Sequence, residues 1–273
     1  MTALPSTTHI RLELKGPVLH LWLNRPEIRN ALSRQMTDDI AATFAAIRDD
    51  RAMRIVIIRG AGGTFCAGGD LKNMAVSGAA PQPGAPDDLI EGNLRFGRML
   101  QAINSAPQAI IAAVEGHAMG GGIGFASVAD VTIAAPDAMF QMSEVRFGIV
   151  PAAISPFVVR RIGLTAARRF GVSGARLTAR EAAAVGLAHI AAPDKAAFEA
   201  EIIVATDQIL KCAPGAVAET KMLMLAAAEA TPITELLGRA ALSFAAAVRG
   251  AEGQEGTRAF VEKRAPQWVV KSS

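Results

Sequence analysis

The stretch Gly116-His117-Ala118-Met119-Gly120-Gly121-Gly122-Ile123-Gly124 decides the fold of this chain, together with the shorter Phe65-Cys66-Ala67-Gly68-Gly69-Asp70-Leu71. An apolar run of strand type precedes each of them, and the later stretch opens a helix. Each stretch can therefore present an exposed backbone N–H at a strand-to-helix turn. Glycine suits such a turn because it tolerates φ angles that a side chain forbids.

Strands and helices alternate outward from these two stretches. The run 18–23 is a strand that ends before Pro26, because proline disfavours helical geometry at the residue preceding it. Ser33 is expected to cap a helix that runs to Ile47, with an apolar stripe of Met36, Ile40, Phe44 and Ile47. Further strands are expected at 54–59, 109–114 and 131–134, and a further helix at 94–103. This alternation predicts an α/β fold.

The second part of the chain has a different character. Segment 76–88 is rich in Gly, Pro, Ala and Ser and is expected to be a mobile loop. From about residue 196 strands disappear, and we expect helices at 198–210, 215–230, 233–249 and 253–264. Several have enough apolar residues around their circumference to need cover from another surface. We therefore divide the chain into a core, 1–195, and a helical oligomerisation region, 196–273.

Composition excludes several classes of function. About half of the 273 residues are apolar (51%), and the net charge of +3 is too small to indicate a nucleic-acid partner. Cys66 and Cys212 are far apart in sequence, which gives neither a disulfide framework nor a metal-ligand spacing, and no metal is expected. No signal-type or membrane-spanning run is visible, so we expect no membrane partner and a soluble, cytoplasmic protein.

The residues suggest a chemistry before any family is considered. Two backbone N–H donors brought together would form an oxyanion hole for a thioester carbonyl, so that a proton can be added to or removed from its α-carbon. Glu144 lies between apolar residues, a setting that raises the pKa of a carboxyl group and helps it to hold or deliver a proton. The other polar or reactive candidates are expected to be structural: Asp70, Asp130, His117 and Cys66.

Five motifs in order carry a family resemblance: Leu23-Asn24-Arg25-Pro26 with Asn30-Ala31-Leu32, the segment 65–71, Met119-Gly120-Gly121-Gly122, Ser143-Glu144 with Gly148-Ile149-Val150-Pro151, and Ala259-Phe260-Val261-Glu262-Lys263-Arg264. Together they resemble the crotonase, or enoyl-CoA hydratase/isomerase, superfamily. The resemblance implies a spiral of ββα turns followed by a C-terminal helical region that packs trimers, often paired into hexamers. It also implies an acyl-CoA thioester as ligand and no cofactor apart from the coenzyme A of the substrate.

The resemblance also assigns roles to residues. The oxyanion donors map onto the N–H groups of Gly69 and Gly121, and the catalytic acid maps onto Glu144. The family's other catalytic glutamate maps onto Gly124, which is a departure. The implied substrate contacts are Arg25, Ala31, Ala67, Asp70, Leu71, Gly120, Gly124, Pro151, Phe260 and Lys263, with Arg25 and Lys263 on the nucleotide phosphates.

A single catalytic glutamate in place of two limits the reactions that we expect the chain to catalyse. We expect an enoyl-CoA hydratase for a 3-branched, glutaconyl-type thioester, because the missing side chain at Gly124 would leave space for the branch or for water. The region around Gly124 and Glu144 resembles bacterial 3-methylglutaconyl-CoA and isohexenylglutaconyl-CoA hydratases. A Δ3-Δ2-enoyl-CoA isomerase, which needs a single base, and a catalytically silent acyl-CoA-binding trimer remain as alternatives. The sequence leaves open whether the assembly is a trimer or a hexamer.

Overall fold

The computed structural model describes residues 3–70, 85–229 and 231–270. Its main sheet has the strand order β1-β2-β3-β4-β6-β9, in which β1 is antiparallel to β2 and every other neighbouring pair is parallel. The strands of this sheet are β1 (Ile10–Lys15), β2 (Val18–Leu23), β3 (Ile55–Gly60), β4 (Ala109–Val114), β6 (Val131–Ala134) and β9 (Ile190–Ala191). The expected strands at 18–23, 109–114 and 131–134 are confirmed, and the one at 54–59 is shifted by one residue.

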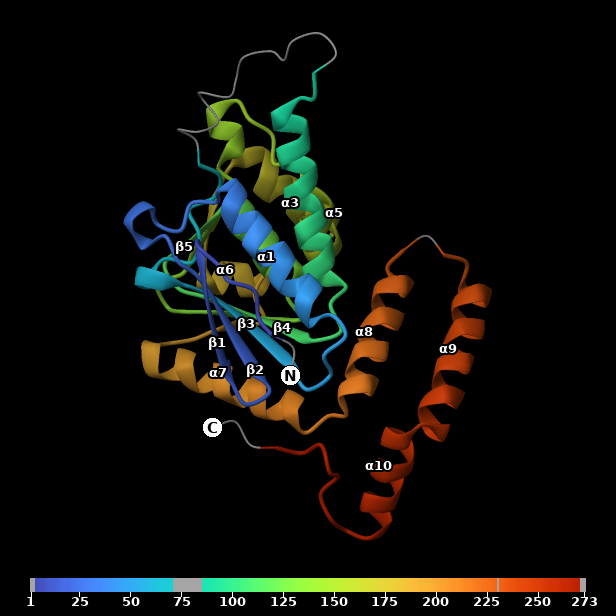
Figure 1. The fold of residues 1–273 in the computed structure, drawn as a ribbon. Coiled ribbons are helices and arrows are strands. Elements are labelled where there is room, and N and C mark those ends of the chain that lie inside the picture. The colour runs from blue at the N-terminus through green and yellow to red at the C-terminus, as the bar shows by residue number, and fades with distance from the viewer. Residues whose placement is uncertain (1–2, 71–84, 230, 271–273) are drawn as a thin grey trace.

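Helices cover both faces of this sheet, as Figure 1 shows for α1 and α3 on one face and α7 on the other. The helices are α1 (Arg34–Ile47), α3 (Asp88–Asn104), α4 (Gly121–Val128), α5 (Ser155–Ser173), α6 (Ala179–Ala184), α7 (Lys195–Leu210), α8 (Pro214–Ala227), α9 (Ile233–Arg249) and α10 (Ala251–Val261), with short 3-10 turns η1 (Pro26–Ile28), η2 (Ala61–Gly63) and η3 (Glu144–Phe147). The expected cap of α1 is confirmed, because Ser33 Oγ accepts a hydrogen bond from Met36 N–H.

Strand alternation divides the core into two layers. In β4, Ile110, Ala112 and Val114 pack in the layer that holds the apolar stripe of α1. Their alternating neighbours Ile111 and Ala113 pack in the other layer, with Phe198 of α7. Successive side chains of a strand point to opposite faces, so both faces of the sheet are buried.

A smaller sheet turns the chain beside the second glycine stretch. It consists of β5 (His117–Met119), parallel to β7 (Met139–Gln141), which is antiparallel to β8 (Arg176–Thr178). Our sequence analysis did not predict these three-residue strands. Cys66 N–H donates to His117 O at 2.8 Å, and Met119 N–H donates to Cys66 O at 2.8 Å. These bonds hold the two glycine-bearing stretches side by side.

Helix α3 begins earlier than expected. The Asp87 side chain accepts hydrogen bonds from the N–H groups of Leu89 and Ile90. This cap starts the helix at Asp88, at the end of the loop expected over 76–88, whereas residues 76–84 of that loop lie outside the described residues.

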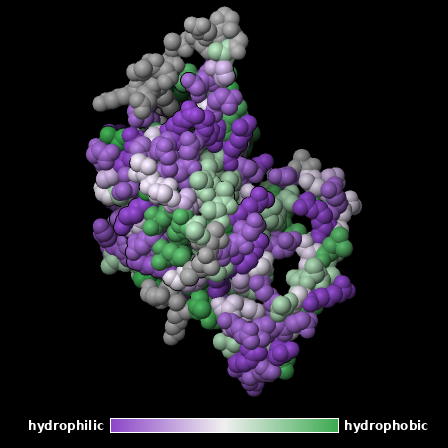
Figure 2. Space-filling model, in the orientation of Figure 1, coloured by the Kyte–Doolittle hydropathy of each residue, from purple (hydrophilic) through white to green (hydrophobic). Residues whose placement is uncertain are grey.

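The C-terminal region is helical, as expected, and α9 and α10 extend away from the core (Figure 1). Helix α8 is anchored by buried Lys221, whose Nζ lies 2.8 Å from Asp130 Oδ2 and 3.0 Å from Gln108 O. Helix α9 has no buried residue among those described and exposes Ile233, Leu237, Leu242 and Phe244. Figure 2 shows hydrophobic surface in the region of this helix. None of the described helices is both long enough and apolar enough to cross a membrane. The boundary placed between residues 195 and 196 stays a prediction.

Candidate active site

The first glycine stretch directs the N–H of Gly69 away from its β-bridge partner. Leu32 and Gly69 form a parallel β-bridge in which Leu32 N–H donates to Gly68 O at 2.8 Å. Because the peptide unit is planar and trans, the N–H of Gly69 points opposite to the Gly68 carbonyl and away from Leu32. Gly68 allows this turn with a φ of 88°.

The second glycine stretch presents a similar donor at the start of α4. Gly120 O accepts from Ile123 N–H at 2.9 Å, so the N–H of Gly121 points the other way, out of the helix N-terminus. The helix dipole adds positive potential there. A Cβ added to Gly120 would lie 3.6 Å from Gly68 Cα, so the two stretches meet at these glycines.

Glu144 brings a carboxylate to the place where the two glycine stretches meet. A Cβ added to Gly120 would lie 2.9 Å from Glu144 Oε1, which shows how closely the carboxylate approaches the backbone there. Glu144 Oε2 is buried and has no hydrogen-bond partner among the described residues. Burial raises the pKa of this carboxyl, opposed in part by its own backbone N–H. The structure therefore places a carboxylate of increased basicity beside Gly120, the residue that precedes the Gly121 donor and that meets Gly68.

The space expected at Gly124 is absent. A Cβ there would lie 2.8 Å from Leu100 Cδ1 and 2.9 Å from Ile154 Cγ2. The side chains of α3 and of the residue preceding α5 fill the volume that the missing glutamate would otherwise take. Gly124 therefore serves close packing of α4, and the expectation that it opens room for a substrate branch is wrong.

Two expected contact residues near the first stretch bind each other. Arg25 NH1 donates to Ala31 O at 2.8 Å, and Arg25 NH2 lies 3.9 Å from Asp70 Oδ2. Ala67 N–H donates to Arg29 O at 2.9 Å. These contacts bring Arg25, Ala31, Ala67 and Asp70 together at one edge of the candidate site. Leu71 lies outside the described residues.

The remaining expected contacts divide into two groups. Pro151 lies between Glu144 and α5, and its carbonyl accepts from the Ser155 N–H at 3.1 Å and from the Ser155 hydroxyl at 2.6 Å. Phe260, at 85% exposure, belongs to α10, and Lys263 follows that helix with a left-handed φ of 53°. Within one chain, α10 extends away from the sheets and from α3 (Figure 1), so the helix that carries Phe260 and precedes Lys263 lies outside the core that holds the glycines and Glu144.

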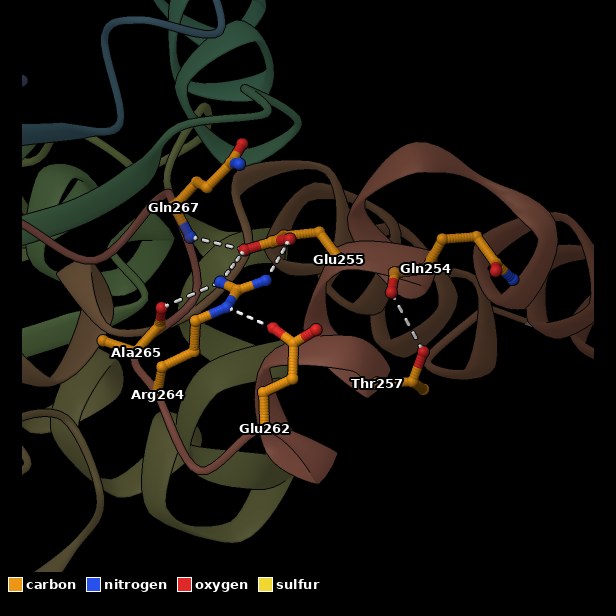
Figure 3. Close-up of polar contacts among 7 residues, drawn as sticks. All are labelled: Gln254, Glu255, Thr257, Glu262, Arg264, Ala265 and Gln267. Carbon is orange, nitrogen blue, oxygen red and sulfur yellow. Dashed lines mark hydrogen bonds and ion pairs between the residues drawn. The ribbon is translucent and has the colours of Figure 1, made fainter.

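The neighbouring Arg264 is held by carboxylates, as Figure 3 shows. Its NH1 and NH2 donate to Glu255 at 2.6 and 2.9 Å, and its Nε donates to Glu262 at 2.6 Å. The guanidinium lowers the pKa of Glu255 to about 2. Arg264 thus ties the end of α10 to the chain that follows.

The residues expected to be structural have such roles, with one difference. Asp130 Oδ2 accepts from Ile110 N–H at 2.7 Å as well as from Lys221. Cys66 is fully buried, which raises the pKa of its thiol to about 12. The difference is His117, whose buried Nδ1 has no hydrogen-bond partner among the described residues. Within residues 3–70, 85–229 and 231–270, no three His, Cys, Asp or Glu side chains form a group that could hold a metal ion.

Sequence reasoning missed the apolar residues that border the N–H donors. A Cβ added to Gly121 would lie 2.3 Å from Leu32 Cδ1 and 3.0 Å from Phe96 Cζ. The ring of Phe96 packs edge to face on Phe125 of α4, with centroids 6.1 Å apart. The spacing of apolar residues marks Phe96 and Phe125 as core residues of their helices. That α3 and α4 contact each other can be seen only in the folded structure.

The chain is similar to known proteins over nearly its whole length. The family model described as enoyl-CoA hydratase/isomerase matches residues 13–271. The chain is 34% identical over 268 residues to a carnitinyl-CoA dehydratase of Proteus mirabilis, covering 95% of this chain and 97% of that protein. The crystal structure of an enoyl-CoA hydratase/isomerase from Marinobacter aquaeolei superposes with a TM-score of 0.91 at 44% identity, covering 96% of this chain and 99% of the other. The structure of Pseudomonas aeruginosa AtuE has the same TM-score at 46% identity, covering 96% and 100%.

Proposed function

The chain belongs to the enoyl-CoA hydratase/isomerase family and has its crotonase fold, and on that premise we propose that it adds water across the double bond of an enoyl-CoA thioester. The observation that supports this most is the position of Glu144, a half-buried residue whose carboxylate lies against Gly120, the residue before the Gly121 donor, with Oε2 buried. Such a group can stabilise an enolate and move a proton at its α-carbon.

The proposed steps use only these groups. The N–H groups of Gly69 and Gly121 donate to the thioester oxygen and draw electrons from the conjugated double bond. The Glu144 carboxylate takes a proton from water as the hydroxide forms a bond to C3, and the resulting acid gives that proton to C2. One water molecule is consumed, and Glu144 returns to its starting state. The raised pKa of Glu144 favours the first transfer.

We further propose a 3-branched, glutaconyl-type acyl group. The support is the resemblance of the sequence around Gly124 and Glu144 to hydratases of that kind. Room for the branch does not come from Gly124, because Leu100 and Ile154 fill its side.

An isomerase is the second candidate, and the absence of a carboxylate at position 124 favours it. Moving a double bond needs one base that takes a proton from one carbon and returns it to another. Glu144 with the two N–H donors is sufficient for that. A silent acyl-CoA-binding protein would use the same donors without proton transfer.

Mass spectrometry over a panel of straight and 3-branched enoyl-CoA thioesters separates these functions. Hydration adds the mass of water, isomerisation leaves the mass unchanged, and the silent protein binds without turnover. The Glu144→Gln variant is the control, because the amide keeps the shape but cannot transfer a proton at neutral pH. Persistent hydration by that variant would remove Glu144 from the mechanism.

We also propose a homotrimer or a pair of trimers, and a cytoplasmic location. The exposed apolar residues of α9 support self-association. Coenzyme A phosphates would contact Arg25 and Lys263, the latter from a neighbouring subunit, because α10, which Lys263 follows, extends away from the core within one chain (Figure 1). Light scattering on the wild type and on Phe244→Glu tests the assembly: a monodisperse, active monomer in the wild type would contradict it.

A further inference from the structure

Two side chains that flank Glu144 in sequence donate hydrogen bonds to the same main-chain oxygen. Gln141 Nε2 donates to Gly174 O at 2.7 Å, and Arg146 Nε donates to Gly174 O at 3.1 Å. A carbonyl oxygen has two lone pairs, so it can accept both bonds at once. The segment 141–146, which contains Glu144, is therefore held at both of its ends by one acceptor.

Gly174 lies where the end of α5 meets this segment. It follows the last residue of α5 and has the left-handed conformation, with φ 57° and ψ 26°, which suits glycine. A Cβ added to Gly174 would lie 3.1 Å from Val145 Cγ2 and 3.3 Å from Arg146 Nε. The turn η3 therefore approaches Gly174 more closely than a side chain at that position would allow.

Gln141 connects the same acceptor to the second glycine stretch. It is the last residue of β7 and is only 3% exposed. Its Oε1 accepts from Arg176 Nε at 3.1 Å, so both ends of its side-chain amide are bonded. Its main-chain oxygen accepts from Gly120 N–H at 2.9 Å, and Gly120 precedes the Gly121 donor. Gln141 therefore fixes the end of α5 relative to Gly120.

Arg146 holds the other end of the segment, beyond Glu144. Both residues belong to the 3-10 turn η3, and Arg146 is exposed. A functional side chain keeps its position when hydrogen bonds fix the residues that support it. Removal of the bond from Arg146 would release one end of the segment, whereas the buried bonds of Gln141 and the core would remain.

We propose that Arg146 is a positioning residue, whose hydrogen bond from Nε to Gly174 O keeps the carboxylate of Glu144 against Gly120. The inference rests on the proposed function for the role of Glu144 in proton transfer. The acceptor is a neutral carbonyl, so a neutral donor at the position of Nε should replace arginine. The positive charge of Arg146 is then dispensable.

Two substitutions at this position separate the hydrogen bond from the charge. Arg146→Gln removes the charge but keeps a donor, because the side-chain nitrogen of glutamine is bonded to Cδ, as Nε of arginine is. Arg146→Met keeps an unbranched side chain of similar length and has no donor. A misplacement of about 1 Å costs about 100-fold in rate, so Arg146→Met should lower kcat about tenfold and change KM less than about twofold. Arg146→Gln should keep most of the wild-type kcat.

Arg161 supplies a matched control. Its Nε also donates to a glycine carbonyl at 3.1 Å, that of Gly186, but its other bonds reach Ala129 and Thr132 and not the segment that carries Glu144. Arg161→Met should lower the urea concentration at the midpoint of unfolding and leave kcat unchanged. This control separates a loss of positioning from a general loss of stability.

The measurements are steady-state kinetics, with the enoyl-CoA thioester that the wild type converts fastest, and crystal structures of the two Arg146 variants. Glu144 Oε1 should move away from Gly120 in Arg146→Met and stay in place in Arg146→Gln. An unmoved Glu144 in Arg146→Met, or equal kcat values in the two variants, would overturn the inference. Full activity of Glu144→Gln, or no turnover by the wild type, would instead refute the proposed function, and the crystal structures would still decide what holds Glu144.

Discussion

Alanine in place of Gly120 is the sharpest test of how the backbone positions Glu144. Gly120 has φ 48° and ψ −115°, a conformation that residues with side chains rarely adopt, and its added Cβ would lie 2.9 Å from Glu144 Oε1. Contacts closer than 3.0 Å are essentially never seen for a Cβ, so the carboxylate must move.

The size of the effect follows from that geometry. An ordinary contact begins at 3.4 Å, so Oε1 must retreat by 3.4 − 2.9 = 0.5 Å. A misplacement of about 1 Å costs about 100-fold in rate, so half of it should lower kcat about tenfold. Backbone strain should in addition lower the free energy of unfolding by about 1–3 kcal/mol.

The assay is steady-state hydration of crotonyl-CoA, with stability measured by urea unfolding. Gly16→Ala is the control: it also has a positive φ, 53°, but its Cβ would meet nothing within 4 Å. It should lose stability and keep kcat. A folded Gly120→Ala enzyme with wild-type kcat would show that contact with Gly120 does not position the carboxylate.

The remaining predictions concern charge and anchoring. Because burial raises the pKa of Glu144, kcat/KM should fall on the acid side with a midpoint above that of an ordinary glutamate. The pKa of Glu144 is then higher in the folded state than in the unfolded chain, so ionisation of this carboxyl destabilises the fold as pH rises. Glu144→Gln should therefore be thermally more stable than the wild type at neutral pH but not at acidic pH. Arg54→Ala should cost at least about 3 kcal/mol in urea unfolding because it breaks buried hydrogen bonds to several main-chain carbonyls, whereas exposed Arg51→Ala should change stability by less than about 0.5 kcal/mol. Lys263→Ala should raise KM for acyl-CoA more than it lowers kcat, because remote phosphate contacts contribute uniform binding, and an unchanged KM would remove Lys263 from the site.

Local signals predicted most of the elements. The cap at Ser33 and the apolar stripe of α1 lie within one stretch of sequence, and the uninterrupted apolar run of β4 marks a strand buried on both faces. The strands of the small sheet escaped prediction because three residues carry too little periodicity, and because β5 lies in a stretch dominated by glycine.

The sequence indicated the glycines and the glutamate that lie together in the structure, but not the apolar side chains around them. Glycines next to strand and helix ends, and a glutamate between apolar residues, are visible in sequence. The side chains that fill the space at Gly124 are not visible in sequence, because Leu100 and Ile154 come from other parts of the chain. A glycine in the sequence does not show which side chains pack against it. The role of Arg54 was missed for the same reason, since its acceptors Cys212 and Trp268 lie more than 150 residues away in sequence.

The placement of α9 has a consequence for any measurement on this protein. Within one chain, α9 packs mainly on α8 and α10 and leaves large apolar side chains in water. If copies of the chain cover these side chains, the free energy of unfolding increases with protein concentration by mass action. The apparent Tm should then rise on concentrating the sample, and a melting curve recorded on a dilute solution would describe the dissociation of subunits as much as the unfolding of one chain.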